Sequence, residues 1–156
     1  MAVRAVAIGS NLHVDDAYSW LVASQPNSHT FLRALAATEN TPPLFYVLLS
    51  FLPIDGAVWL RLPAAVPGVL LCVAVYLVAH RRLGLRVALV AALAVAVSPF
   101  LVTYSDLARG FMLADLALLV ALWAAVRLCE SESPGGWALF AVAGAIAVYT
   151  EYDSLI

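Results

Sequence analysis

Residues 62–79, with the sequence LPAAVPGVLLCVAVYLVA, run without a single charged side chain. A helix that crosses a bilayer needs about 20 consecutive, mostly apolar residues, and this stretch comes close to that length. Three further stretches of similar character follow along the chain, at 87–104, 111–129 and 137–150. All four are rich in Ala, Val and Leu and lack the apolar–polar alternation of barrel strands. The sequence therefore predicts an all-α membrane protein with four transmembrane helices.

The composition supports this class and excludes others. The chain has 156 residues, of which 64% are hydrophobic and 12% charged, whereas soluble domains are about 25% charged. Too little polar surface remains to cover a water-soluble globule, and disorder is excluded even more firmly. The net charge of −2 gives no basic excess, so nucleic acid is not an expected partner. Cys72 and Cys129 stand alone, with neither metal-binding nor disulfide spacing.

Arginine placement predicts how the chain is oriented. The short loop 80–86 carries three of the eight arginines, and Arg127 ends the third apolar stretch. The positive-inside rule places 80–86 and 127–136 in the cytoplasm. We therefore expect a multi-pass cell-membrane protein in which residues before 62, the 105–110 link and the residues after 150 face outward. Eight of the ten acids then fall on or near the outer side: Asp15, Asp16, Glu39, Asp55, Asp106, Asp115, Glu151 and Asp153. Such a concentration of acids indicates a functional site there.

Residues 11–61 form the predicted outer loop. Its apolar segments, 17–23 and 44–52, are too short to cross a bilayer and are expected to lie along the membrane surface as interfacial helices. Residues 1–10 are also apolar but too short to span, and we interpret them as the remnant of a first helix. The whole of 1–156 is thus expected to be one partial transmembrane domain, a polytopic helical bundle, from the N-terminal part of a longer protein.

Five motifs occur in an order that resembles a known family. They are Asp15-Asp16-Ala17-Tyr18-Ser19, Pro42-Pro43-Leu44-Phe45-Tyr46, Leu60-Arg61-Leu62-Pro63-Ala64-Ala65, Ser98-Pro99-Phe100 with Ala108-Arg109, and Tyr149-Thr150-x-Tyr152. In this order they resemble the N-terminal part of bacterial membrane glycosyltransferases of the GT-C superfamily, which are relatives of the protein O-mannosyltransferases and of the lipid A aminoarabinose transferases. The resemblance covers nearly the whole chain and about the first third of such an enzyme.

The resemblance implies a partial GT-C fold and a specific chemistry. The donor would be a polyprenyl-phosphate sugar, and the acceptor would be a hydroxyl of a protein, lipid or polysaccharide at the outer face of the membrane. The first acid of the outer-loop pair maps onto Asp15, which would act as the base in an inverting displacement. A positioned base of this kind contributes about 10²–10⁴-fold to a rate. Asp16 stands where the family usually has Glu.

The remaining site residues are expected to bind substrate. The leaving phosphate stays anionic, so it needs positive charge rather than a general acid. Arg109 is the best candidate for that contact, because a guanidinium forms paired hydrogen bonds with phosphate oxygens. Asp16 and Asp106 would assist in the same site. We expect no cofactor and no metal, and a metal site formed by His13 with the two adjacent acids is a weak alternative.

Each of these residues also has a purely structural interpretation. Asp15 or Asp16 could be the N-cap of the helix that follows. Arg109 could extend to the membrane interface or pair with Asp106 three residues earlier. Asp115 lies inside an apolar stretch, where a charge is costly and needs a cavity or a partner. The sequence leaves these interpretations open.

Three positions depart from the family pattern, and rival functions remain. Thr41 stands where His is common, Leu107 where an acid is usual, and Glu151 where His or Lys is usual. These departures leave open the interpretation that the protein is a catalytically degenerate relative of the family. A non-enzymatic lipid or solute transporter, or an envelope-assembly subunit, is the other alternative. A transporter is expected to carry polar groups and broken helices at the bilayer midplane, whereas these polar residues lie at the predicted outer ends.

Overall fold

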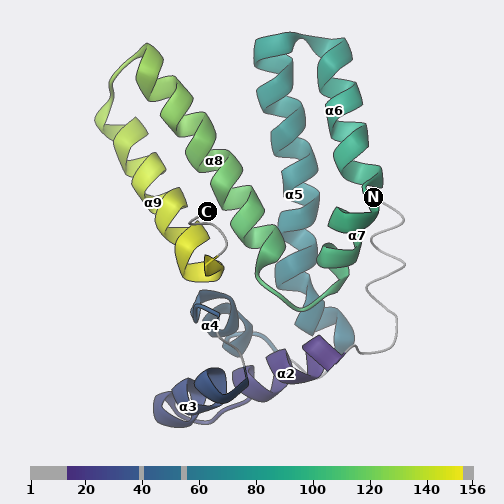
Figure 1. The fold of residues 1–156 in the computed structure, drawn as a ribbon, viewed down its shortest axis with the longest axis vertical. Coiled ribbons are helices and arrows are strands. Elements are labelled where there is room, and N and C mark those ends of the chain that lie inside the picture. The colour runs from purple at the N-terminus through teal and green to yellow at the C-terminus, as the bar shows by residue number, and fades with distance from the viewer. Residues whose placement is uncertain (1–13, 39–40, 54–55, 153–156) are drawn as a thin grey trace.

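The computed structural model describes residues 14–38, 41–53 and 56–152, and within these ranges every regular element is a helix (Figure 1). In chain order the helices are α2 (Val14–Ala23), α3 (Ser28–Thr38), α4 (Leu44–Ser50), α5 (Ala57–Leu83), α6 (Leu85–Val97), α7 (Pro99–Asp106), α8 (Phe111–Glu130) and α9 (Pro134–Thr150). The prediction of an all-α membrane protein is confirmed.

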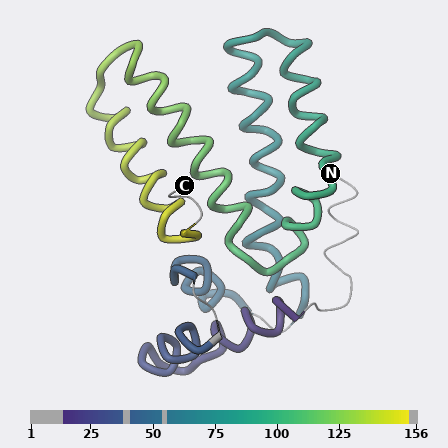
Figure 2. Tube along the Cα trace, viewed as in Figure 1, coloured from purple at the N-terminus to yellow at the C-terminus, as the bar shows by residue number. Residues whose placement is uncertain are grey.

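The long helices form two antiparallel hairpins, α5–α6 and α8–α9, which meet where α8 packs against α5 (Figures 1 and 2). Among the described residues, α5 and α8 are each long and apolar enough to cross a membrane, and α6 with α7 would make a third, bent span. Helix α9 is also apolar but has 17 residues. Residues 1–10, interpreted above as the remnant of a helix, lie outside the described part of the chain.

The predicted span 87–104 is divided into two helices. α6 ends at Val97, α7 begins at Pro99, and their axes are bent by 54°. Proline has no N–H to continue the helical ladder, and its ring clashes with the preceding turn. Ser98 adopts the extended conformation that precedes a proline, and its Oγ accepts a hydrogen bond from the N–H of Leu101 at 3.5 Å. The bend directs α7 back towards the start of α5.

Helix α5 extends beyond the predicted span 62–79 at both ends. Its first turns contain Trp59 and Arg61, which lie outside the predicted span, and a charge such as that of Arg61 is costly beside lipid. The helix continues through Arg61 because neighbouring carboxylates bind its guanidinium. At its other end Gly84, with φ of 86°, turns the chain directly into α6, a backbone conformation that glycine adopts without strain.

Helices α2, α3 and α4 lie together across one end of the long helices (Figure 1). A cluster of buried apolar side chains holds them against the start of α5 and the α7–α8 link. Its larger members are Val22, Leu35, Phe45, Tyr46, Leu49 and Leu60. This cluster fixes the position of α2, whose first turn carries Asp15 and Asp16.

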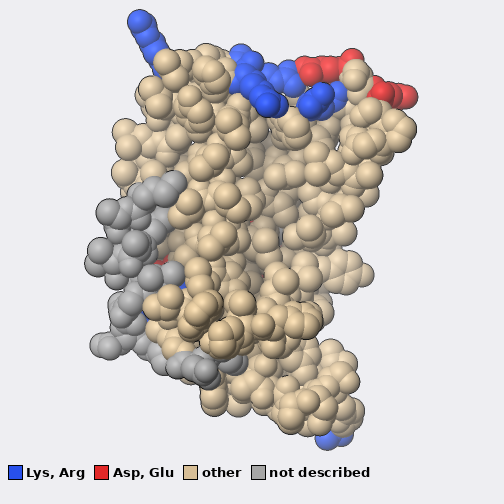
Figure 3. Space-filling view, turned by 180° about the vertical axis from the view of Figure 1, so that it is seen from behind, with Lys and Arg blue, Asp and Glu red and all other residues tan. Residues whose placement is uncertain are grey.

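Charged side chains divide between the two ends of the molecule. Arg81 and Arg82 lie in the last turn of α5, Arg86 begins α6, and Arg127 lies in the last turn of α8. Figure 3 shows arginine and acidic side chains gathered at this end, above a face that is almost entirely uncharged. The α2–α4 group and the α7–α8 link lie at the opposite end (Figure 2). The two arginine-bearing turns therefore share one end, as the orientation argument requires.

Candidate functional site

The centre of the candidate site is Arg61, a fully buried arginine between two carboxylates. Its Nε and Nη2 donate to Oδ2 of Asp16 at 3.1 and 2.6 Å, and its Nη1 donates to Oδ1 of Asp106 at 3.0 Å. Asp16 is also fully buried, and the side chain of Asp106 is 14% exposed. A buried guanidinium is tolerated only when such partners satisfy it. The three side chains come from α2, α5 and α7, so their ion pairs join these helices at one point.

Asp16 also binds the α7–α8 link. Its second oxygen, Oδ1, accepts a hydrogen bond from the backbone N–H of Ala108 at 3.0 Å. Ser19, one turn further along α2, donates from its Oγ to the carbonyl oxygen of Ala108 at 2.6 Å. Both polar groups of this buried backbone unit are thereby satisfied by α2, as burial requires. The link that carries Arg109 is therefore held against the first turns of α2.

Asp15 and Arg109 form a second, more accessible ion pair. Nη2 of Arg109 lies 2.8 Å from Oδ1 of Asp15, and the two side chains are 19% and 39% exposed, respectively. This pair and the buried group of Arg61, Asp16 and Asp106 together contain three carboxylates and two guanidinium groups, which gives one net negative charge. Since the buried group fixes both backbones, the Asp15–Arg109 pair is presented at a defined place on the surface of the site.

The end of α9 approaches the same link. A Cβ placed on Gly110 would lie 2.5 Å from Cγ2 of Thr150 and 3.2 Å from Oε1 of Glu151. Glu151 is the C-cap residue that follows α9, and it is only 6% exposed. The absence of a side chain at Gly110 thus lets α9 pack closely beside Arg109, and it brings a further carboxylate to the edge of the site.

The four residues expected from the sequence, Asp15, Asp16, Asp106 and Arg109, are brought together. Asp15 and Asp16 lie inside the first turn of α2, so neither takes the N-cap position that precedes a helix. Carboxylates are also favoured there by the helix dipole. Asp115 on α8 makes none of the ion pairs described above, and His13, Glu39, Asp55 and Asp153 lie outside the described residues.

Sequence reasoning missed the role of Arg61. The residue belongs to one of the five motifs, but no function was derived for it. A signal was present, because an arginine at the edge of an apolar helix requires a partner at the same depth. Its two partners, Asp16 and Asp106, are each 45 residues away in the sequence. No local pattern identifies a contact at that separation.

No candidate metal site was found in the described part of the chain. There, no group of three or more His, Cys, Asp or Glu side chains is placed to hold a metal ion. The chemistry that this arrangement offers directly is acid–base and electrostatic: Asp15 can accept a proton, and Arg109 can bind an anion.

Comparison with known proteins gives one match. A family model described as dolichyl-phosphate-mannose-protein mannosyltransferase matches residues 40–156, well over half of the chain. The matched region contains Arg61, Asp106 and Arg109, while Asp15 and Asp16 precede it. No curated protein and no solved structure matches the chain.

Proposed function

The chain belongs to the dolichyl-phosphate-mannose-protein mannosyltransferase family, and from this premise we propose that it forms part of a membrane enzyme that transfers a sugar from a polyprenyl-phosphate donor to an acceptor hydroxyl. The family makes it a membrane glycosyltransferase of the GT-C type. The identity of the donor, the class of acceptor and the outward orientation of the site belong to the proposal. The acceptor would be a hydroxyl group of a protein, lipid or polysaccharide.

The observation that carries the proposal is the partly exposed Asp15–Arg109 pair, held at 2.8 Å by a buried network. In the proposed reaction the acceptor oxygen attacks C1 of the sugar, and Asp15 takes the proton from that hydroxyl. The bond between C1 and the phosphate oxygen breaks, and the lipid phosphate leaves with the electron pair. Arg109 stabilises the charge that develops on that phosphate. A direct displacement of this kind inverts the anomeric centre.

Asp16, Asp106 and Arg61 are positioning residues in this scheme. Asp16 was expected from the sequence to bind substrate, but its two oxygens are engaged by Arg61 and by the Ala108 N–H. It therefore supports the site by fixing the backbone beside Arg109. Asp106, which was also expected to bind substrate, is slightly exposed and positions Arg61 through their ion pair.

The arrangement of charge supports an enzyme working at one membrane surface. Helix α2 and the α7–α8 link, which carry Asp15 and Arg109, lie at the end opposite the α5–α6 and α8–α9 turns (Figure 1), where the positive-inside rule places the outer face. In this proposal no general acid is needed, because the leaving phosphate stays anionic, and Arg109 rather than a cofactor supplies the positive charge beside it. Localisation in a cell membrane, with several crossings and the site facing outward, completes the proposal.

The test is transfer of labelled sugar by membranes that contain the protein, comparing Asp15→Asn with the parent. Loss of the base is expected to lower the rate by about 10²–10⁴-fold, because Asn keeps the size of the side chain but cannot accept the proton. Glu132→Gln, which changes an exposed acid at the opposite end, is the matched control and is expected to retain full activity. Undiminished transfer by Asp15→Asn would remove Asp15 from the mechanism.

A further inference from the structure

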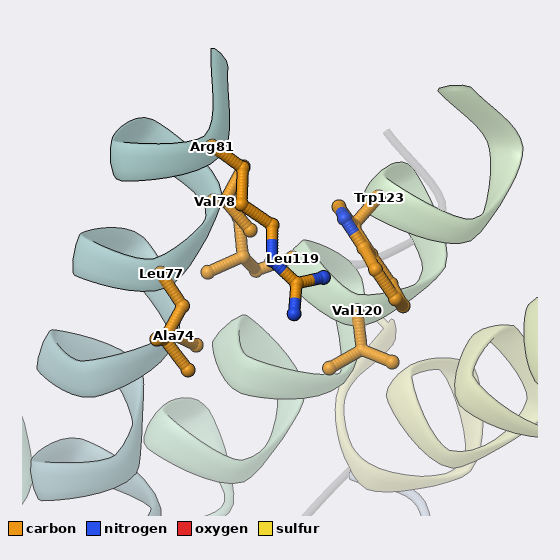
Figure 4. Close-up of a pocket in the computed structure, with 7 residues that line it drawn as sticks. All are labelled: Ala74, Leu77, Val78, Arg81, Leu119, Val120 and Trp123. Carbon is orange, nitrogen blue, oxygen red and sulfur yellow. The ribbon is translucent and has the colours of Figure 1, made fainter. Parts of the chain in front are cut away.

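A second candidate binding site lies at the arginine-bearing end, between α5 and α8. Towards this end the two helices separate (Figure 1), and a cavity of about 240 Å³ opens between them. Its walls are apolar and include Leu77, Val78, Leu119 and Val120, and Arg81 and Trp123 lie at its edge (Figure 4).

Arg81 brings a positive charge to this apolar cavity. Figure 4 shows its side chain extending from α5 into the space between the helices, facing Trp123 on α8. Its guanidinium carbon lies 6.0 Å from the centre of the Trp123 ring, and that of Arg127 lies 5.2 Å from the same ring. A tryptophan ring attracts cations and is favoured at the membrane interface. The ring therefore lies near two guanidinium groups, of which Arg81 lines this cavity and Arg127 lines a neighbouring one.

The acids at this end leave Arg81 available, whereas Arg127 interacts electrostatically with Glu130. Glu130 forms its ion pair with Arg82, whose Nη2 donates to Oε2 at 2.9 Å. Within the described ranges, neither Arg81 nor Arg127 forms an ion pair with a carboxylate. Among the residues that line the cavity there is no acid. The opening is thus apolar in its depth and cationic at its edge.

We propose that this cavity binds one anionic phospholipid of the surrounding leaflet, with its phosphate on Arg81 and part of an acyl chain between α5 and α8. Basic pockets between transmembrane helices recognise anionic lipid headgroups, and a guanidinium binds phosphate oxygens through paired hydrogen bonds. The volume exceeds that of the roughly 150 Å³ apolar cavity that accommodates benzene. It therefore has room for several methylene groups of one chain.

The position of the cavity distinguishes this lipid from the proposed sugar donor. Helix α2 and the α7–α8 link, which carry Asp15 and Arg109, lie at the other end of the long helices (Figure 1), so a phosphate bound at Arg81 cannot present its sugar to Asp15. The inference consequently does not depend on the proposed transfer reaction, and its test needs no measurement of activity.

The experiment is native mass spectrometry of the purified protein in detergent. Phosphatidylglycerol and phosphatidylcholine with identical acyl chains are titrated separately, and the binding constant of the first retained lipid is measured. Phosphatidylglycerol is expected to bind at least tenfold more tightly, with Arg81→Gln weakening its binding about fivefold, which corresponds to roughly 1 kcal/mol for one arginine near the surface. Arg86→Gln, at the start of α6 and outside the cavity lining, is the charge-matched control and is expected to bind as the parent does.

A second pair of variants tests the acyl-chain half of the site. Ala74 lines the cavity, whereas its neighbour Val73 is exposed on α5 and does not. Ala74→Phe is expected to fill the space and weaken phosphatidylglycerol binding severalfold with Arg81 intact, while Val73→Phe leaves it unchanged. Equal binding of the two lipids by the parent, or equal effects within either matched pair of variants, would overturn the proposal. Gel filtration of each variant confirms that it remains folded and monodisperse.

Discussion

Buried charge is the dominant feature at the scale of single residues. Arg61 and Asp16 are both fully buried, and each neutralises the other. A buried pair of this kind contributes little net stability, because desolvation of the two ions offsets their attraction. Removal of one partner is far more costly, since the remaining charge is left without compensation. The prediction that follows separates these two cases.

Arg61→Met is expected to lower the stability of the protein by about 3–5 kcal/mol, because it leaves the Asp16 carboxylate buried without its cation. The measurement is thermal unfolding in detergent, followed by circular dichroism. Adding Asp16→Asn to Arg61→Met is expected to restore part of the loss, since the uncompensated charge is removed. Strictly additive losses in the double variant would show that the two residues do not interact. Arg33→Met, on the exposed surface of α3, is expected to leave the melting temperature unchanged.

The residues of the site were largely predictable from sequence, whereas their pairing was not. Asp15, Asp16, Asp106 and Arg109 were selected because they lie at the predicted outer ends of apolar stretches and match family motifs. Their partners are separated by 45 to 94 residues, and no local pattern specifies contacts at that distance. Arg61 escaped assignment for the same reason, although its charge within an apolar helix required some partner.

At the scale of helices, close packing at the α7–α8 link depends on one small residue. Gly110→Ala would place its Cβ 2.5 Å from Cγ2 of Thr150, so α9 or the link must shift. Overpacking of this kind typically costs about 1–3 kcal/mol, and the shift would also displace Arg109. We therefore expect both a lower melting temperature and reduced sugar transfer.

Two further variants make this prediction specific. Gly144→Ala, in the middle of α9, meets no atom within 4 Å and is expected to be neutral or to stabilise by up to about 1 kcal/mol through helix propensity. Thr150→Ser removes Cγ2 but keeps the hydroxyl that donates to the carbonyl of Ile146. Combined with Gly110→Ala it is expected to recover stability, and failure to recover would place the strain elsewhere.

The existence of the long helices followed from the apolar pattern, whereas α3 was not predicted by it, and helix boundaries depended on local chemistry that the pattern does not record. α9 begins at Pro134 rather than at the first long apolar run, because the Oγ of Ser133 accepts from the N–H of Gly136 and proline is favoured in the first turn. The start of α7 has the same local sequence, a serine cap followed by a proline, at Ser98-Pro99. Its Ser-Pro sequence marked a break, yet the expected span ran through it.

At the scale of the whole molecule, the distribution of arginines predicts which end faces the cytoplasm. Cys129 is exposed near the arginine-bearing end, whereas Cys72 is buried within α5. A membrane-impermeant maleimide is therefore expected to label the parent protein only after the cells are permeabilised, and predominantly at Cys129. The measurement is the amount of label on the purified protein from intact and permeabilised cells.

The matched control moves the cysteine to the opposite end. In a Cys129→Ser background, Ala36→Cys places a thiol on the exposed side of α3 and is expected to be labelled in intact cells. The reverse pattern, with Cys129 labelled in intact cells, would invert the orientation and place the Asp15–Arg109 pair on the cytoplasmic side.

The hydrogen bonds that hold Ala108 also set the order in which the protein matures. The backbone N–H of Ala108, which donates to Asp16, is synthesised 92 residues later in the chain. At a synthesis rate of about 5–20 residues per second, roughly 5–18 s pass between the two reaching the end of the ribosomal tunnel. During that interval α2 lacks its contact with the α7–α8 link, although Arg61 and most of the buried apolar cluster follow it sooner. The acidic first turn of α2 is thus synthesised early, and its contacts with the α7–α8 link form only after that link has been synthesised.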